Sequence, residues 1–203
     1  MTTDVSRRQQ IEDAASTLFR ERGYAATSVR DIAQALDMQG GSLYAHVASK
    51  EDMLWSIVVR AADGFNREVG PIAEAESQPA KVRLRGMIGA HVGVVTGAQK
   101  DAAVFLHEWR FLNPERRAQI GERRDNYEGL FRQVIADGVK TGEFQPVDPR
   151  LTAMAILSAL NGIATWYRAD GPLSAEDIAD QHASLFLSGL ANNEPNFIMR
   201  SFG

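Results

Sequence analysis

Residues 7–55 decide the fold, and they read RRQQIEDAASTLFRERGYAATSVRDIAQALDMQGGSLYAHVASKEDMLW. The first part of this stretch has apolar side chains at the 3.6-residue period of a helix that buries one face. These side chains are Ile11, Ala14, Ala15, Leu18 and Phe19. Gly23 follows and predicts the end of the helix, because glycine readily adopts the backbone conformation that closes a helix.

Three more helices are predicted in the same stretch. Thr27 or Ser28 can cap the second helix, whose apolar residues again share one face. A turn at residues 36–38 then precedes a short third helix at about residues 39–45. Ser49 can cap a fourth helix, with Asp52 at the spacing of a capping box. Two short helices joined by so tight a turn have the geometry of a helix-turn-helix.

The short third helix has side chains that suit a DNA-reading helix. Gln39 can pair with adenine through two hydrogen bonds, and Ser42 can hydrogen-bond to several bases. Gly40 and Gly41 would let the backbone approach phosphates closely. Further side chains that can reach phosphates are Tyr44, His46 and Lys50. Short amphipathic helices with small turns also occur in ordinary cores, so the spacing leaves a purely structural interpretation open.

The segments RRQQIEDAASTLFRERGYAATSVRDIAQAL and GGSLYAHVASKEDML resemble the N-terminal signature of the TetR family of repressors. The resemblance is dense over residues 7–55 and implies that Leu43 packs the third helix onto the others. The phosphate contacts that it implies come from Thr27, Tyr44, His46 and Lys50. The base-reading surface that it implies consists of Gln39, Gly40 and Ser42.

Three residues depart from the family pattern. Asp37 stands where the family has a turn glycine, but aspartate tolerates the left-handed conformation better than most residues, so the turn should survive. Gln39 replaces a serine or threonine at the start of the reading helix, and Val47 replaces an aromatic residue. These departures leave the base preference open, but they do not change the expected mode of binding.

The rest of the chain also predicts helices, so the fold class is all-α with about nine helices. The longer helices are expected at about residues 81–96, 101–112, 113–140, 150–167 and 174–190. Residues 71–79 and 141–149 are expected to be loops, and the chain after Leu190 a loose tail. The predicted domains are a helix-turn-helix domain at residues 1–50 and a larger ligand-binding and dimerisation domain at residues 51–203.

The family resemblance also implies a homodimer in which the last two long helices pack against those of a partner. These helices have more apolar surface than one subunit is expected to cover, at Met154, Leu157, Leu160, Ile163, Ile178, Leu185, Phe186 and Leu190. Small residues would allow a close approach, at Ser158, Ala159, Gly162 and Ser188. The alternative is that all these residues complete the core of a monomer.

Two segments of the body, VFLHEWRFLNPERR and ALNGIATWYRADGPLSAEDIA, are similar to TetR-like repressors that respond to acyl-CoA thioesters. Such a ligand needs an apolar tunnel for the chain and cations for the phosphates of CoA. The candidate ligand-binding residues are Met87, Phe105, Glu108, Trp109, Arg110, Arg124, Tyr127, Phe131, Trp166 and Arg168. Further candidate phosphate partners are Arg116, Arg117 and Arg123. The aromatic residues could instead be ordinary core, and the arginines could be a solvated face paired with neighbouring glutamates.

Composition and missing motifs exclude several classes of protein. The 203 residues include no cysteine, which excludes disulfides and zinc–thiolate sites. The four histidines lack metal-ligand spacing, and no nucleophile elbow or phosphate-binding loop is present, so neither a metal site nor an enzyme is expected. The net charge of −4 argues against a histone-like binder but allows a local DNA-binding face. The absence of a secretory signal or a membrane-length apolar run predicts a soluble cytoplasmic protein.

The sequence therefore predicts a ligand-responsive transcriptional repressor that binds palindromic double-stranded DNA as a homodimer. No cofactor is expected, and the effector would be a fatty acyl-CoA or a related CoA thioester. The helix at about residues 50–66 would link the effector to the reading heads. One alternative is a TetR-like repressor that senses another hydrophobic ligand, such as a drug. Another is a non-enzymatic helical protein that binds a ligand or a partner.

Overall fold

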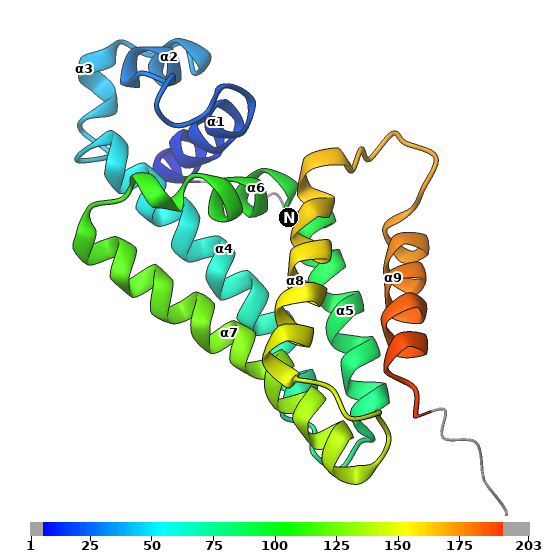
Figure 1. Cartoon of the computed structure of the whole chain (residues 1–203). Helices are drawn as coiled ribbons and strands as arrows, with labels where there is room; N and C mark the ends of the chain where they lie inside the picture. Colours follow the sequence, from blue (N-terminus) through cyan, green and yellow to red (C-terminus); the bar gives the residue numbers. More distant parts are fainter. Residues whose placement is uncertain (1–5, 193–203) are drawn as a thin grey trace, which may run out of the picture.

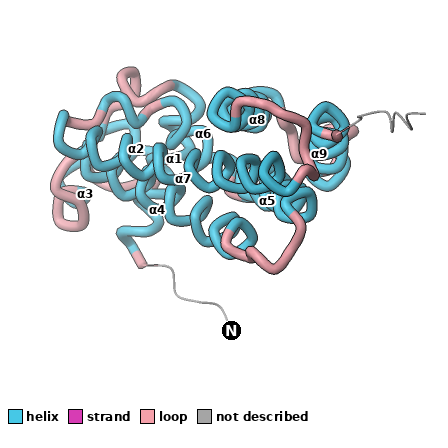
Figure 2. The backbone as a smooth tube through the Cα atoms, turned by 60° about the horizontal axis from the view of Figure 1, so that its bottom comes forward, coloured by secondary structure: helices cyan, strands magenta, loops and turns pink. Residues whose placement is uncertain are grey.

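A computed structural model describes residues 6–192 of the chain, and it is helical throughout that range apart from the connecting loops (Figures 1 and 2). The N-terminal unit consists of α1 (Arg7–Arg22), α2 (Val29–Ala35) and α3 (Gly40–Leu43). The only β-type pairing among the described residues is an isolated bridge between Phe144 and Ala191. The expected all-α fold is confirmed.

Local chemistry explains why the N-terminal helices begin and end where they do. The Ser28 side chain accepts a hydrogen bond from the Asp31 N–H, and the Asp31 carboxylate accepts one from the Ser28 N–H, which completes a capping box. Gly23 ends α1 with a φ of 82°. Asp37 adopts a φ of 52° in the turn before α3, as expected for an aspartate in place of glycine.

The larger body begins with α4 (Lys50–Ala73), which runs from the N-terminal unit into the rest of the molecule (Figure 1). The remaining elements are α5 (Ala80–Gly97), α6 (Gln99–His107), the short 3₁₀ helix η1 (Trp109–Phe111), α7 (Pro114–Thr141), α8 (Pro149–Trp166) and α9 (Ala175–Leu190). Helix α5 contacts α4, α6, α7, α8 and α9, and is therefore the centre of the body. Its buried face includes Leu84, Ile88 and Val92, each 0% exposed.

In the larger body, two element boundaries differ from the sequence predictions. Residues 71–73 were expected in a loop, but α4 continues through Pro71 to Ala73. Pro71 has no N–H to donate to the carbonyl one turn earlier, but the helix continues past it, and the Glu74 N–H bonds to the Gly70 carbonyl. The segment expected as one helix at residues 101–112 divides into α6 and η1.

Nothing within residues 6–192 is both long and apolar enough, as a helix, to span a bilayer. The tail predicted after Leu190 falls largely at residues 193–203, outside the described residues. The proposed division of the chain after residue 50 coincides with the start of α4, which contacts both α1 and the body. That division stays a prediction.

Candidate functional site

The first candidate surface surrounds α3 at the outer end of the N-terminal unit (Figure 1). Gln39, Ser42, Tyr44 and His46 are exposed there, and 56% of Tyr44 is accessible to solvent. Leu43 is 0% exposed and holds α3 onto the core, the packing role expected for it. The helix is shorter than predicted, because residues 44–46 form turns after Leu43. Polar and aromatic side chains thus project from one short helix and the turn that follows it.

Two other predicted phosphate contacts, Thr27 and Lys50, lie behind this surface. The Thr27 hydroxyl is buried and lies 2.9 Å from the Gly23 carbonyl oxygen, to which it donates. The Lys50 ammonium donates to the carbonyl oxygens of Tyr24 and Thr27 at 2.8 and 2.7 Å. It also lies 4.0 Å from the centre of the Tyr24 ring, and burial lowers the pKa of Lys50. Both side chains hold the loop between α1 and α2 in this structure.

That same loop is joined to the body through Glu108. The Tyr24 N–H donates to Glu108 Oε2 at 3.0 Å, and the Tyr24 ring stacks on Phe111 at 5.6 Å between centroids. Arg116, near the start of α7, makes ion pairs with Asp52 at 2.5 Å and Glu51 at 3.4 Å in the first turn of α4. The segment from α6 to α7 therefore contacts the N-terminal unit and the start of α4 directly.

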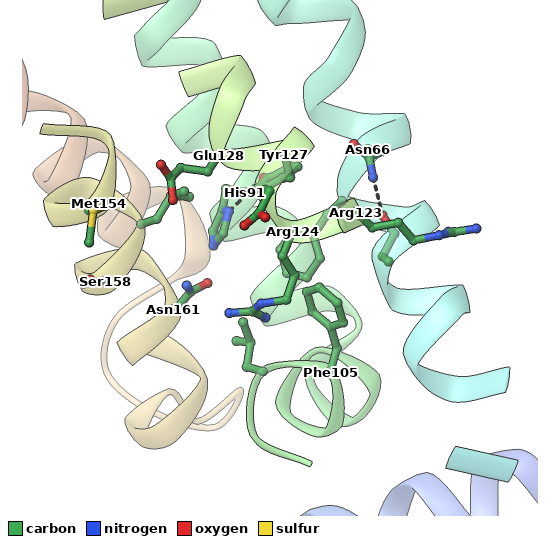
Figure 3. A pocket seen from close by; sticks show the side chains of 15 residues that line it. Asn66, His91, Phe105, Arg123, Arg124, Tyr127, Glu128, Met154, Ser158 and Asn161 are labelled. Carbon is green, nitrogen blue, oxygen red and sulfur yellow. Dashed lines mark hydrogen bonds between the residues drawn. The ribbon is translucent and has the colours of Figure 1, made fainter. Parts of the chain in front are cut away.

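The second candidate site is a cavity of about 270 Å³ inside the body (Figure 3). Its apolar walls come from α4, α6 and α8, and consist of Ala62, Phe65, Phe105, Leu106, Met154 and Leu157. Its polar residues come from α4, α5, α7 and α8, and are Asn66, His91, Arg123, Arg124, Asp125, Tyr127, Glu128, Ser158 and Asn161. The site therefore combines an apolar wall with a polar part that includes both cationic and anionic side chains.

His91 lies at the inner side of this cavity and is 1% exposed. Its Nδ1 is 2.9 Å from the hydroxyl oxygen of Tyr127, and the Phe65 ring lies 4.9 Å from the imidazole. Burial lowers the pKa of His91 to about 3, although the nearby Asn161 carboxamide opposes this shift, so the imidazole is neutral at physiological pH. Burial also raises the pKa of Tyr127, which keeps its hydroxyl protonated.

Arg124 is the cation of the cavity. Its guanidinium lies 5.2 Å from the ring centres of both Phe105 and Trp109, which holds it by cation–π contacts. Burial lowers the pKa of Arg124, and across residues 6–192 no carboxylate forms an ion pair with it. Arg123, by contrast, pairs with Asp63 at 2.6 Å. Arg124 can therefore bind an anionic or carbonyl group of a ligand.

The structure brings only part of the predicted ligand-binding set to the cavity. Phe105, Arg124 and Tyr127 line it, and Trp109 reaches its border by contact with Arg124. Met87 and Phe131 are 0% exposed core residues. The predicted residues outside the lining are Glu108, Arg110, Trp166 and Arg168. Glu108 instead contacts Tyr24, and Arg168 pairs with Asp170 at 3.1 Å.

The sequence interpretation did not include His91, Asn66 or Asn161 in the ligand site. A usable signal existed for His91, because it is a polar residue among the apolar residues Met87, Ile88, Val92 and Val95 of α5. Such a histidine needs a hydrogen-bond partner or a function. Asn66 and Asn161 carry no comparable signal, because each lies among varied neighbours on its own helix.

The face of α8 and α9 that was expected to form a dimer is divided between core and surface. Leu160, Ile163, Ile178 and Leu190 are buried within the single chain. Large apolar side chains that remain exposed on these helices are Leu151, Met154, Trp166 and Leu185. Leu185 is the most exposed of these, at 69%.

Comparison with known proteins gives the family. Residues 11–57 match the family described as "Bacterial regulatory proteins, tetR family", and residues 77–190 match "Tetracyclin repressor-like, C-terminal domain". The HTH-type transcriptional repressor KstR2 of Rhodococcus jostii is 31% identical over 188 residues, which cover 92% of each chain. The fatty acid metabolism regulator protein of Bacillus subtilis is 27% identical over 90% of this chain and 95% of its own.

A solved structure shows the same fold. AibR in complex with isovaleryl coenzyme A and operator DNA superposes with a TM-score of 0.81 at 30% identity, and the match covers 89% of this chain and 97% of AibR. The N-terminal match includes α3, and the C-terminal match includes the cavity residues of α5, α6, α7 and α8 but not those of α4. The chain therefore belongs to the TetR family of bacterial regulatory proteins.

Proposed function

We propose that this protein is a transcriptional repressor that binds a palindromic operator as a homodimer and releases it when a small molecule enters the cavity. One observation carries the proposal. Helix α4 begins beside the exposed reading surface and, further along, supplies Ala62, Phe65 and Asn66 to the cavity that contains His91. A ligand in the cavity thus touches the same rigid element that positions the reading head.

For the DNA contacts we propose two classes of residue. Gln39, Gly40 and Ser42 read bases, and Tyr44 and His46 contact phosphates. Thr27 and Lys50 remain part of the proposed site because they hold the loop between α1 and α2 in place. Their contribution to phosphate binding is then to fix the backbone at the entrance to α2.

For assembly we propose that α8 and α9 of two subunits form one four-helix interface. The exposed apolar residues Leu151, Met154 and Leu185 support this arrangement, because such residues seldom cluster on a face that stays in water. Exposed small residues, including Ser158, Ala159 and Ser188, would let the helices approach closely. A dimer of this kind places two reading helices on successive turns of one DNA face.

For the effector we propose an acyl-CoA thioester. The apolar cavity suits an acyl group, and the unpaired guanidinium of Arg124 suits an anionic or carbonyl group. The complex of AibR with isovaleryl coenzyme A and the relation to a fatty acid regulator support the same class. Trp166 and Arg168 lie outside the cavity and remain proposed contacts for the CoA portion.

We infer that the mechanism is thermodynamic linkage. A ligand that prefers a different orientation of α4 weakens DNA binding by the factor by which DNA weakens ligand binding. The contacts of Glu108 with Tyr24 and of Arg116 with Asp52 give a second connection between the body and the reading head. No step requires chemical conversion of the ligand, so the protein acts as a regulator and not as an enzyme.

The test is operator binding with and without effectors at one stated salt concentration, because phosphate contacts make the affinity strongly salt-dependent. The DNA is the region upstream of the protein's own gene, with a random-sequence selection in parallel. We expect tight binding that an acyl-CoA releases and free CoA does not. Absence of specific binding in both assays would contradict the regulator. Tight binding that no acyl-CoA changes would contradict the effector class, and turnover of an acyl-CoA would contradict the non-enzymatic mechanism.

A further inference from the structure

The buried imidazole of His91 has one ring nitrogen without a partner. Within residues 6–192, Nε2 forms no hydrogen bond of normal length and angle, although the ring is 1% exposed; the Asn161 carboxamide interacts with the imidazole and raises its pKa against the larger effect of burial. A buried polar atom left unpaired destabilises the folded state, so such an atom in a native fold calls for an explanation. A ligand that supplies the missing partner is one explanation, because Nε2 belongs to a residue that lines the cavity.

The hydrogen bond with Tyr127 decides whether Nε2 donates or accepts. The Tyr127 hydroxyl is buried, and His91 Nδ1 is the partner at hydrogen-bond distance, 2.9 Å away. If the hydroxyl donates to Nδ1, its hydrogen is satisfied and the proton of the neutral imidazole lies on Nε2. The reverse arrangement leaves both the phenolic hydrogen and Nε2 unpaired. Fewer unpaired groups result when Nε2 is a donor, so a ligand must bring an acceptor.

The side chains around Nε2 indicate which kind of acceptor atom the ligand must bring. In Figure 3 the side chains of His91, Arg124 and Asn161 point toward one another, while Phe105 closes the apolar side. The guanidinium of Arg124 offers donors only, and it has no carboxylate partner within residues 6–192. An oxygen atom placed between these groups can accept from both His91 and Arg124. A carbonyl oxygen has two lone pairs and fits this requirement.

The size of the cavity limits the group that carries the oxygen. Small-molecule sites commonly have volumes of about 300–1,000 Å³, so a cavity of about 270 Å³ lies at the small end of that range. A short or branched acyl group fits this space, whereas a long fatty acyl chain exceeds it.

We propose that His91 recognises the carbonyl oxygen of a short acyl group, which accepts a hydrogen bond from Nε2–H and a second one from Arg124. This inference rests on the proposed function, namely that the cavity binds the effector. It adds that the recognised group of the ligand is a carbonyl and that His91 is the residue that recognises it. Tyr127 is a positioning residue, since it acts by holding the imidazole in the tautomer that donates from Nε2.

The test compares two probes that differ in one oxygen atom, isovaleryl-CoA and its thioether S-isopentyl-CoA. Calorimetry with the full-length wild type should show that the thioester binds about tenfold more tightly, which corresponds to one hydrogen bond to an otherwise unpaired buried donor. In His91→Phe this preference should fall clearly, because only the hydrogen bond from Arg124 remains. His91→Gln retains a donor and should recover part of it. His107→Gln, on the exposed side of α6, is the matched control and should keep the full preference.

Each outcome has a distinct meaning. Equal binding of the two probes by the wild type, or an unchanged preference in His91→Phe, would overturn the carbonyl assignment and leave the regulator intact. Palmitoyl-CoA that binds as tightly as isovaleryl-CoA would overturn the size limit. Operator binding without affinity for any of these probes would overturn both this inference and the proposed effector class. Free isovalerate that binds as tightly as the thioester would support carbonyl recognition and contradict the proposed recognition of the CoA portion.

If His91→Phe does not fold, His91→Gln and Tyr127→Phe carry the test, and Tyr127→Phe should reduce the preference without removing it.

Discussion

At the residue scale, the neutral state of His91 has a measurable effect on stability. Its pKa is about 3 in the folded protein and about 6.5 in an unfolded chain, so the unfolded state binds a proton first as the pH falls. The contribution of His91 to the free energy of unfolding is therefore fully present above about pH 6.5, and it decreases as the pH falls below that value. Between pH 7 and pH 5 the loss is about 2 kcal/mol.

Urea unfolding of the wild type and of His91→Phe at both pH values checks this effect. The wild type should lose about 2 kcal/mol more than the variant between pH 7 and pH 5, because only the wild type must keep a buried histidine uncharged. Equal losses would show that His91 is protonated in the folded state. In that case the tautomer argument for Nε2 would also be wrong.

Lys50 gives a second prediction at this scale. Its ammonium bonds to two carbonyl oxygens of the loop between α1 and α2, so Lys50→Met should destabilise the protein by about 1–3 kcal/mol without any DNA present. A lysine that served only as a phosphate contact would lower operator affinity and leave stability unchanged. Thermal unfolding beside Lys100→Met, an exposed lysine on α6, distinguishes the two roles.

At the scale of elements, the end of α7 depends on the absence of a side chain at Gly138. A Cβ there would overlap the ring of Phe144, which folds back onto the helix. Gly138→Ala should therefore lower the free energy of unfolding by about 1–3 kcal/mol, as overpacking does in other cores. Gly121→Ala on the same helix meets no atom within 4 Å and should be neutral or slightly stabilising. Urea unfolding of both variants is the measurement, and an equal effect would contradict the close packing.

At the scale of the whole molecule, the proposed dimer places exposed leucines of α8 and α9 in the interface. Leu185→Glu should raise the dimer dissociation constant at least about tenfold, because a charge would be buried without a partner. Val82→Glu, which replaces another exposed apolar residue on α5, should leave assembly unchanged. Sedimentation equilibrium checks both variants. A dimer that survives Leu185→Glu together with Leu151→Glu would show that these helices do not form the interface.

The N-terminal unit could be predicted almost completely because its signals are local. The apolar period of α1, the capping box at Ser28 and the left-handed turn at Asp37 each depend on residues close in sequence. The same holds for Asn113, whose side chain caps α7 just before Pro114. The predicted end of α4 was less accurate, because the helix continues through Pro71 to Ala73. Burial of neighbouring residues in α4 outweighs the loss of one hydrogen-bond donor at Pro71.

The lining of the cavity could be predicted only in part because it depends on which helices meet. Phe105, Arg124 and Tyr127 were predicted as ligand contacts and line the cavity, but Met87 and Phe131 have equally suitable side chains and lie in the core. A helical period shows that a residue faces inward, but it does not show whether that interior is packed or hollow.

The sequence by itself therefore determined the all-helical class, the helix-turn-helix and the family, because caps, turns and apolar periods act over a few residues. Only the tertiary structure decided the position of the cavity and the use of Glu108 and Lys50 as contacts within the protein. It also decided which leucines of α8 and α9 stay exposed and left Nε2 of His91 without a partner. The physical reason is that these properties arise from side chains distant in the chain, whose spacing is set when α4, α5, α7 and α8 pack together.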